Sequence, residues 1–137
     1  MSVVRALAAL TLALVAAVAE AQPRPEIAAA TATVMGQLEA FRQGDFDAAY
    51  SFASASIHEL FDRPTFETMV RGGYPEIARS VSAVVIEGDV GPDGHIYLKL
   101  TILGTNGRSV DAIYELVREG ADWRINGVVA RPTTGTV

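Results

Sequence analysis

The residues able to do chemistry are few, and none of them forms a recognised catalytic or metal-binding motif. The two histidines, His58 and His95, show no H-x-H or H-E-x-x-H spacing, so the sequence predicts no metal site. G-x-S-x-G, P-loop and dinucleotide fingerprints are absent as well. We interpret each histidine as a solvated or locally bonded side chain, and we expect no metal ion and no cofactor.

Proton-transfer chemistry would need a carboxylate in an apolar cavity, beside a tyrosine or a protonated acid that stabilises an oxyanion. The positions expected to face inward supply tyrosines but no acid. Asp111 and Glu115 are expected on the sheet face opposite Tyr114, and Asp47 and Asp62 lie at helix ends. The sequence therefore predicts no catalytic residue, and whether the protein is an enzyme stays open, with the balance against it.

Composition narrows the function classes. The chain has 137 residues, a net charge of −5 and no cysteine. Its length suits one domain. The absence of cysteine excludes disulfides, thiolate metal sites and a cysteine nucleophile. The negative charge argues against nucleic acid and against docking on an anionic membrane.

The N-terminus is typical of a secretory signal peptide. Arg5 supplies the positive region, Ala6–Val18 is uncharged and apolar, and Ala19-Glu20-Ala21 fits the A-x-A cleavage pattern. The apolar run is too short for a membrane span, although an uncleaved anchor is the alternative. We expect residues 1–21 to be removed, residues 22–137 to form one domain without membrane attachment, and the protein to be periplasmic or secreted.

The first half of the mature chain has helical periodicity. Apolar positions predict a helix over Glu26–Gln43, a corner at Gly44 with Asp45 as N-cap, and a second helix over Phe46–Phe52. Ser56 and Glu59 fit a capping box for a third helix, and Pro64 begins a fourth. The Arg71–Pro75 segment, which contains two glycines, is expected to be a turn.

The second half alternates with the period of strands. Four strands are predicted, at Ser80–Glu87, His95–Leu103, Val110–Arg118 and Trp123–Val129. The turns between them are short, and Asn106-Gly107 is the strongest hairpin signal. Short connections favour an antiparallel meander, and helices followed by strands favour an α+β fold.

One sheet face is expected to pack on the helices. Its members are Ile96, Leu98, Leu100, Ile102, Ala112, Tyr114, Leu116, Trp123 and Ile125. The other face is also rich in apolar residues, namely Val84, Ile86, Tyr97, Leu103, Ile113, Val117 and Val128. Either two copies form a homodimer through this outer face, or the register differs and some of these residues belong to the core.

Several segments resemble the nuclear transport factor 2-like superfamily. Phe41-x-x-Gly44-Asp45-x-x-x-Ala49-Tyr50 is similar to its opening helical hairpin, and the segments YEL and WRINGV are similar to its closing strands. More narrowly, QLEAFRQGDFDAAYSFAS, MVRGGYP and YELV…DWRINGV resemble an uncharacterised bacterial domain family within that superfamily. The resemblance implies a cone-like, cystatin-like roll in which helices line a curved four-stranded antiparallel sheet and leave a cavity.

This superfamily includes isomerases, cyclases, dehydratases and non-catalytic association domains, so the fold does not select a function. If the implied cavity exists, the residues expected nearest to it are Tyr50, Arg71, Tyr74, Tyr114 and Trp123, and Trp123 is more typical of the core. The first four are the candidate ligand-binding residues. Arg71 could hold an anionic ligand or cap a helix carbonyl.

The sequence thus favours an exported module that binds a small apolar or anionic ligand, or that associates with another protein, without catalysis. The alternative is a small isomerase, dehydratase or cyclase acting on an apolar carbonyl compound.

Overall fold

The computed structural model describes residues 24–133, which form an α+β fold. The helices are α2 (Pro25–Arg42), α3 (Phe46–Ser51), α4 (Ala55–Leu60), α5 (Arg63–Gly73) and α6 (Pro75–Ala78). The strands are β1 (Ser80–Val90), β2 (Ile96–Gly104), β3 (Ser109–Glu119) and β4 (Asp122–Pro132). They pair antiparallel in the order β1-β2-β3-β4. The predicted helices-then-meander arrangement is confirmed.

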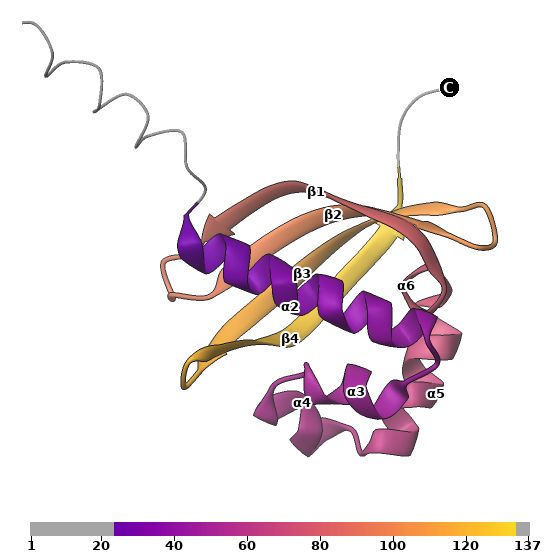
Figure 1. Cartoon of the computed structure of the whole chain (residues 1–137), viewed down its shortest axis with the longest axis horizontal. Helices are drawn as coiled ribbons and strands as arrows, with labels where there is room; N and C mark the ends of the chain where they lie inside the picture. The colour runs from indigo at the N-terminus through magenta and orange to yellow at the C-terminus, as the bar shows by residue number, and fades with distance from the viewer. Residues whose placement is uncertain (1–23, 134–137) are drawn as a thin grey trace, which may run out of the picture.

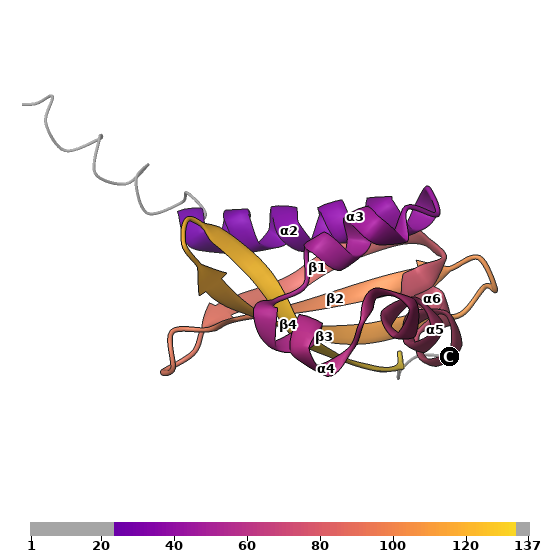
Figure 2. The ribbon, with the colours of Figure 1, turned by 90° about the horizontal axis from the view of Figure 1, so that it is seen from below.

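The helices cover one face of the sheet. α2 runs along that face and contacts β1, β2 and β4, and the shorter helices gather near its C-terminal end (Figure 1). Seen from below, the twisted strands curve past α2, and α4 and α5 lie farther from α2 than α3 does (Figure 2).

The corner between α2 and α3 forms as predicted. Gly44 has a φ of 71°, the left-handed conformation that glycine adopts without strain. The Asp45 carboxylate then accepts a hydrogen bond of 3.0 Å from the backbone N–H of Ala48 and so caps α3. α2 packs closely on the end of α3. Gly36 allows this contact, since a Cβ added there would lie 2.9 Å from the ring of Phe52, the residue after α3.

Two predictions about the middle of the chain are wrong. α4 is capped by Ser54, whose hydroxyl accepts from the Ile57 N–H, and not by Ser56. The helix begins early because the preceding segment is fixed to β4, where the Ser54 N–H donates to the Ile125 carbonyl at 2.8 Å. The expected turn at residues 71–75 is also incorrect, since α5 continues to Gly73 and Pro75 begins the short helix α6.

The inner face of the sheet is apolar and buried, as predicted. On β2, four residues have no exposed surface, namely Ile96, Leu98, Leu100 and Ile102. Their partners on β3 are Leu116, Tyr114, Ala112 and Val110, which are buried too. Burying such side chains contributes about 1.5–3 kcal/mol each, so this layer fixes the pairing register of the sheet.

A β-bulge in β4 reverses one predicted orientation. Glu115 pairs with Gly127, whereas the next residue of β3, Leu116, pairs with Ile125, so Asn126 is an extra residue. Beyond the bulge the side chains change face. Val128 therefore packs against the core instead of facing outward as predicted, and Val129 is 55% exposed.

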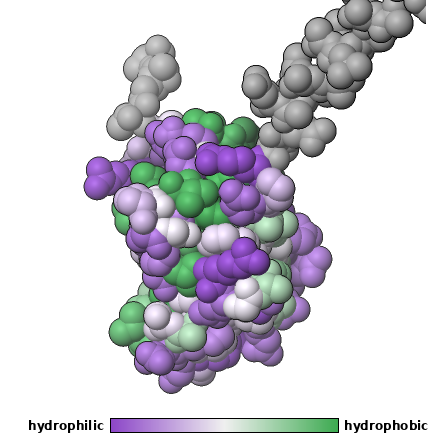
Figure 3. Space-filling view, turned by 90° about the vertical axis from the view of Figure 1, so that its left-hand side faces the viewer, coloured by the Kyte–Doolittle hydropathy of each residue, from purple (hydrophilic) through white to green (hydrophobic). Residues whose placement is uncertain are grey.

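The outer face of the sheet keeps several exposed apolar side chains, which are Val81, Val84, Ile86, Ile113 and Val129. Tyr97, Leu103 and Val117, also predicted there, are only partly exposed. Elsewhere, at the end of the molecule where α2 begins, hydrophobic side chains reach the surface in patches between hydrophilic ones (Figure 3).

None of the helices within residues 24–133 has both the length and the apolar character needed to cross a membrane. The predicted leader, Met1–Ala21, lies outside the described residues.

The cap at the α2–α3 corner gives the first prediction. Replacing Asp45 by alanine removes the acceptor of the Ala48 N–H and should lower the free energy of unfolding by about 1 kcal/mol. Asp45→Asn, which keeps an acceptor oxygen, should cost clearly less. Urea unfolding followed by circular dichroism measures both; an alanine variant as stable as the wild type would contradict the capping role.

Candidate functional site

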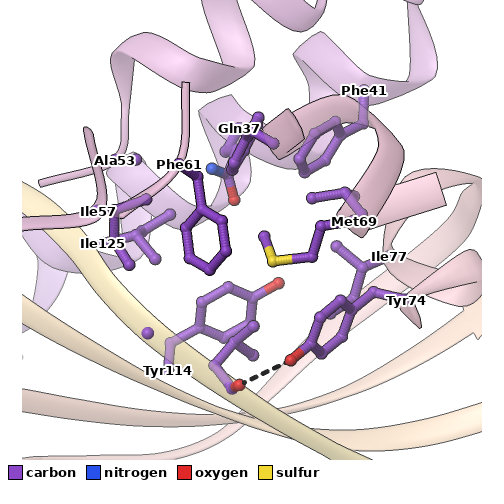
Figure 4. A pocket seen from close by; sticks show the side chains of 14 residues that line it. Gln37, Phe41, Ala53, Ile57, Phe61, Met69, Tyr74, Ile77, Tyr114 and Ile125 are labelled. Atoms are coloured by element: carbon purple, nitrogen blue, oxygen red, sulfur yellow. Dashed lines mark hydrogen bonds between the residues drawn. The ribbon is translucent and has the colours of Figure 1, made fainter. Parts of the chain in front are cut away.

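A pocket with a volume of about 220 Å³ lies between the helices and the C-terminal half of the sheet (Figure 4). Side chains reach it from α2, α4, α5 and α6 on the helical side and from β3 and β4 on the sheet side. The lining residues are Gln37, Phe41, Ala53, Ile57, Phe61, Phe66, Met69, Val70, Tyr74, Ile77, Tyr114, Ile125, Gly127 and Val128.

The lining is almost entirely apolar. None of the described residues that line the pocket is an aspartate, glutamate, histidine, lysine or arginine. Three side chains bring polar atoms to it, those of Gln37, Tyr74 and Tyr114. A pocket of this kind offers apolar contact together with a small number of fixed hydrogen-bonding groups, as small-molecule sites commonly do.

Tyr114 is the deepest of these polar residues. It lies in the middle of β3, where the register directs it to the inner face opposite Leu98 on β2 and Val128 on β4. The residue is 1% exposed, and its hydroxyl has no hydrogen-bond partner. The hydroxyl points toward the centre of the pocket, where Met69 also projects (Figure 4). Burial raises the pKa of the Tyr114 hydroxyl well above its ordinary value, so it is a neutral donor at physiological pH.

Gln37 enters from the helical side. Its amide nitrogen donates to the Ala49 carbonyl at 3.1 Å and so links α2 to α3. This bond fixes the plane of the amide, and the amide oxygen lies on the pocket side (Figure 4). Gln37 was not among the residues expected near the pocket. The sequence signal that could have identified it is a polar residue on the apolar face of the helix that carries Val34, Leu38 and Phe41.

Tyr74 lies at the junction of α5 and α6. Its hydroxyl donates to the Val128 carbonyl at 3.5 Å, which is long for an O–H···O bond and therefore weak (Figure 4). The side chain spans from the helices to β4 beside the pocket.

Of the four candidate residues, Tyr74 and Tyr114 line the pocket, and Tyr50 and Arg71 do not. The Tyr50 hydroxyl donates to the Phe61 carbonyl at 2.6 Å, and its ring stacks on His58. Tyr50 therefore holds α3 against α4. Trp123, the further residue named with them, is a buried core residue that does not line the pocket.

Arg71 lies on the outer side of α5. Its guanidinium pairs with Glu67 at 2.8 Å and lies over the Phe46 ring, 4.3 Å from the centroid. It borders two surface grooves that also contain Arg79 and Thr105. Because Glu67 already neutralises part of its charge, Arg71 is held as a surface ion pair and stacking residue.

The histidines lie outside the pocket. His58 is exposed, and its Nε2 is 2.8 Å from the Tyr50 carbonyl oxygen. His95 lies beside Asp93 and Glu115, and these three are the described residues whose ligand atoms are close enough together to share a metal ion. Local sequence spacing missed this group because Glu115 is brought to it by the pairing of β2 with β3.

Hydrogen bonds hold that cluster together on the outer face. The Tyr97 hydroxyl lies 3.0 Å from an Asp93 oxygen and 3.1 Å from a Glu115 oxygen, and Asn126 donates to Glu115 at 2.6 Å. The bond from Asn126 is the main cause of the lowered pKa of Glu115. The bond to Asp93 is the main cause that raises the pKa of Tyr97 to about 12. Asp111 and Glu115 face away from Tyr114, as predicted.

Comparison with known proteins identifies the family but no activity. No curated protein matches the chain. Residues 23–136 match the family model described as "Domain of unknown function (DUF4864)". This match includes all of the described residues, from before the start of α2 to beyond the end of β4. The protein therefore belongs to the DUF4864 family.

Proposed function

We propose that this protein is an exported module that binds a small, predominantly apolar molecule in the pocket between its helices and β3–β4. The observation that carries the proposal is an apolar pocket of about 220 Å³ with no charged side chain in its described lining. Transfer of an apolar surface from water into such a pocket is favourable by about 25 cal/mol per Å².

The alternative function is a small isomerase, dehydratase or cyclase. Its chemistry would need a carboxylate or an imidazole beside the substrate to move a proton. The acids nearest in sequence to Tyr114, Asp111 and Glu115, are on the opposite face of the sheet, and the two histidines are outside the pocket. This arrangement favours binding over proton transfer.

The finer classification and the location are part of the same proposal. The Gly44–Asp45 helical corner, the antiparallel meander and the pocket between them support placing the chain in the nuclear transport factor 2-like superfamily. The apolar leader that ends in Ala19-Glu20-Ala21 supports export to the periplasm or beyond.

We also propose that two copies associate through the outer sheet face. Ile113, at the middle of β3, is 47% exposed and has exposed Val129 as its neighbour on β4. The same face carries charges of both signs, including Lys99, Asp111 and Arg131. A two-fold axis places one patch against itself, so a face with both signs suits a second copy better than a strongly charged partner.

The pocket proposal predicts that filling the pocket weakens binding. In isothermal titration of the purified protein with α-methylstyrene, a small apolar probe, Val128→Phe should weaken binding by about tenfold or more, equivalent to about 1.4 kcal/mol. The matched control is Val129→Phe, the same change one residue later on the opposite face, which should bind as the wild type does. Equal affinities for the two variants, or no binding to the wild type, would refute the proposed site.

The association proposal predicts a dimer at micromolar concentration in size-exclusion chromatography with light scattering. Ile113→Asp places a charge in the middle of the contact face and should give a monomer of unchanged helix content. Leu60→Asp is the control, because Leu60 is 72% exposed on α4, away from the sheet. A monomeric wild type would remove the proposal.

A further inference from the structure

The Tyr114 hydroxyl is an exception among the buried polar groups of the protein. Most buried polar atoms in folded proteins have a hydrogen-bond partner, and an unpaired one lowers stability. The hydroxyl of Tyr114 has none, although the other tyrosine hydroxyls, those of Tyr50, Tyr74 and Tyr97, all donate to oxygens. A phenylalanine at residue 114 would fill the same space without this cost, so the hydroxyl calls for another explanation.

The surroundings of the hydroxyl show what would satisfy it. Across the strands its neighbours are Leu98 and Val128, and Met69 approaches it from α5 (Figure 4). These side chains bring no strong acceptor to it. The hydroxyl points toward the middle of the side chains that line the pocket. Its missing partner is therefore an acceptor atom on a molecule bound there.

The size and charge of the pocket restrict that molecule. A cavity of about 150 Å³ in an engineered protein core admits benzene, whereas drug-sized ligands occupy about 300–1,000 Å³. The pocket volume of about 220 Å³ therefore suits one ring with a short substituent. An anionic group would be buried here without a cation, because no lysine, arginine or histidine is among the described lining residues.

We propose that the pocket selects a neutral, single-ring-sized apolar molecule carrying a carbonyl-type oxygen, which accepts a hydrogen bond from the Tyr114 hydroxyl. This inference rests on the proposed function and adds the chemical class of the ligand to it. The hydroxyl is then a recognition group, and its lack of a partner in the free protein is the cost of selecting an oxygen-bearing ligand over a hydrocarbon.

Three probes of nearly equal size and shape test the proposal. Acetophenone carries a carbonyl oxygen, α-methylstyrene has a CH₂ group at the same place, and benzoate is the anionic counterpart. Their affinities are measured by isothermal titration for the wild type and for Tyr114→Phe. For each probe, the affinity of the variant is divided by that of the wild type, and these ratios are compared between probes. The hydration of a probe is the same for both proteins and therefore cancels.

The expected result is that Tyr114→Phe weakens acetophenone binding by about five- to tenfold, as loss of one hydrogen bond would. The same substitution should leave the affinity for α-methylstyrene unchanged or raise it, and benzoate should bind neither protein. The control is Tyr50→Phe, because the Tyr50 hydroxyl donates to the Phe61 carbonyl at 2.6 Å and the residue does not line the pocket. It should not change the ratio of the acetophenone and α-methylstyrene affinities.

Each of the other possible results refutes one part of the proposal. If Tyr114→Phe changes both neutral probes equally, the recognition role of the hydroxyl is refuted and the apolar site stands. If benzoate binds most tightly, the neutral class is wrong. If no probe binds the wild type, the proposed function fails with it. Without a probe, Tyr114→Phe should melt at the same or a higher temperature, and a lower melting temperature would indicate a structural partner and overturn the proposal.

Discussion

The burial of the inner face of β2 and β3 in the core shared with the helices is the constraint on which the rest of the structure depends. Ile96, Leu98, Leu100 and Ile102 are fully buried, and a shift of one residue in pairing would turn all of them to solvent. The register is therefore fixed by the core. It also determines the direction of every other residue on these strands, including Tyr114, which is directed inward because Leu98 beside it is.

The pocket follows from how the helical layer is divided. α2 is long enough to cover the sheet along its length, whereas α4–α6 are short and, together with α2, enclose a space against the middle of β3 and β4. The bulge at Asn126 contributes to the wall. It turns Val128 inward, and its own side chain accepts from Ser54 and donates to Glu115, which joins the start of α4 to the outer face of the sheet.

Much of this architecture could be predicted from local sequence signals. Gly44 and Asp45 mark a corner because only a few residue types suit a left-handed residue followed by a cap, and alternation in residues 96–102 is specific for a half-buried strand. The errors arose where tertiary contacts override local patterns. Strict alternation from Ile125 placed Val128 outside, because it took no account of the bulge that the glycine at residue 127 allows. The bridge to β4 moved the α4 cap from Ser56 to Ser54.

The candidate site was less predictable than the fold. Tyr74 and Tyr114 could be named from their expected position. Arg71 and Tyr50 lie close in sequence to residues that line the pocket, but their own side chains make contacts outside it. The Tyr114 hydroxyl lacks a partner because of the side chains that β2, β4 and α5 place around it, and these elements are distant in sequence. No local sequence pattern could have predicted this. The Asp93, His95 and Glu115 group likewise appears only once β2 and β3 are paired.

A crystal structure of the protein with acetophenone bound tests the central claim most directly. The account predicts that the ring lies between α5 and β3–β4 and that its oxygen is about 2.7–2.8 Å from the hydroxyl oxygen of Tyr114. Acetophenone bound elsewhere, or a Tyr114 hydroxyl already donating to a protein oxygen in crystals of the free protein, would contradict it.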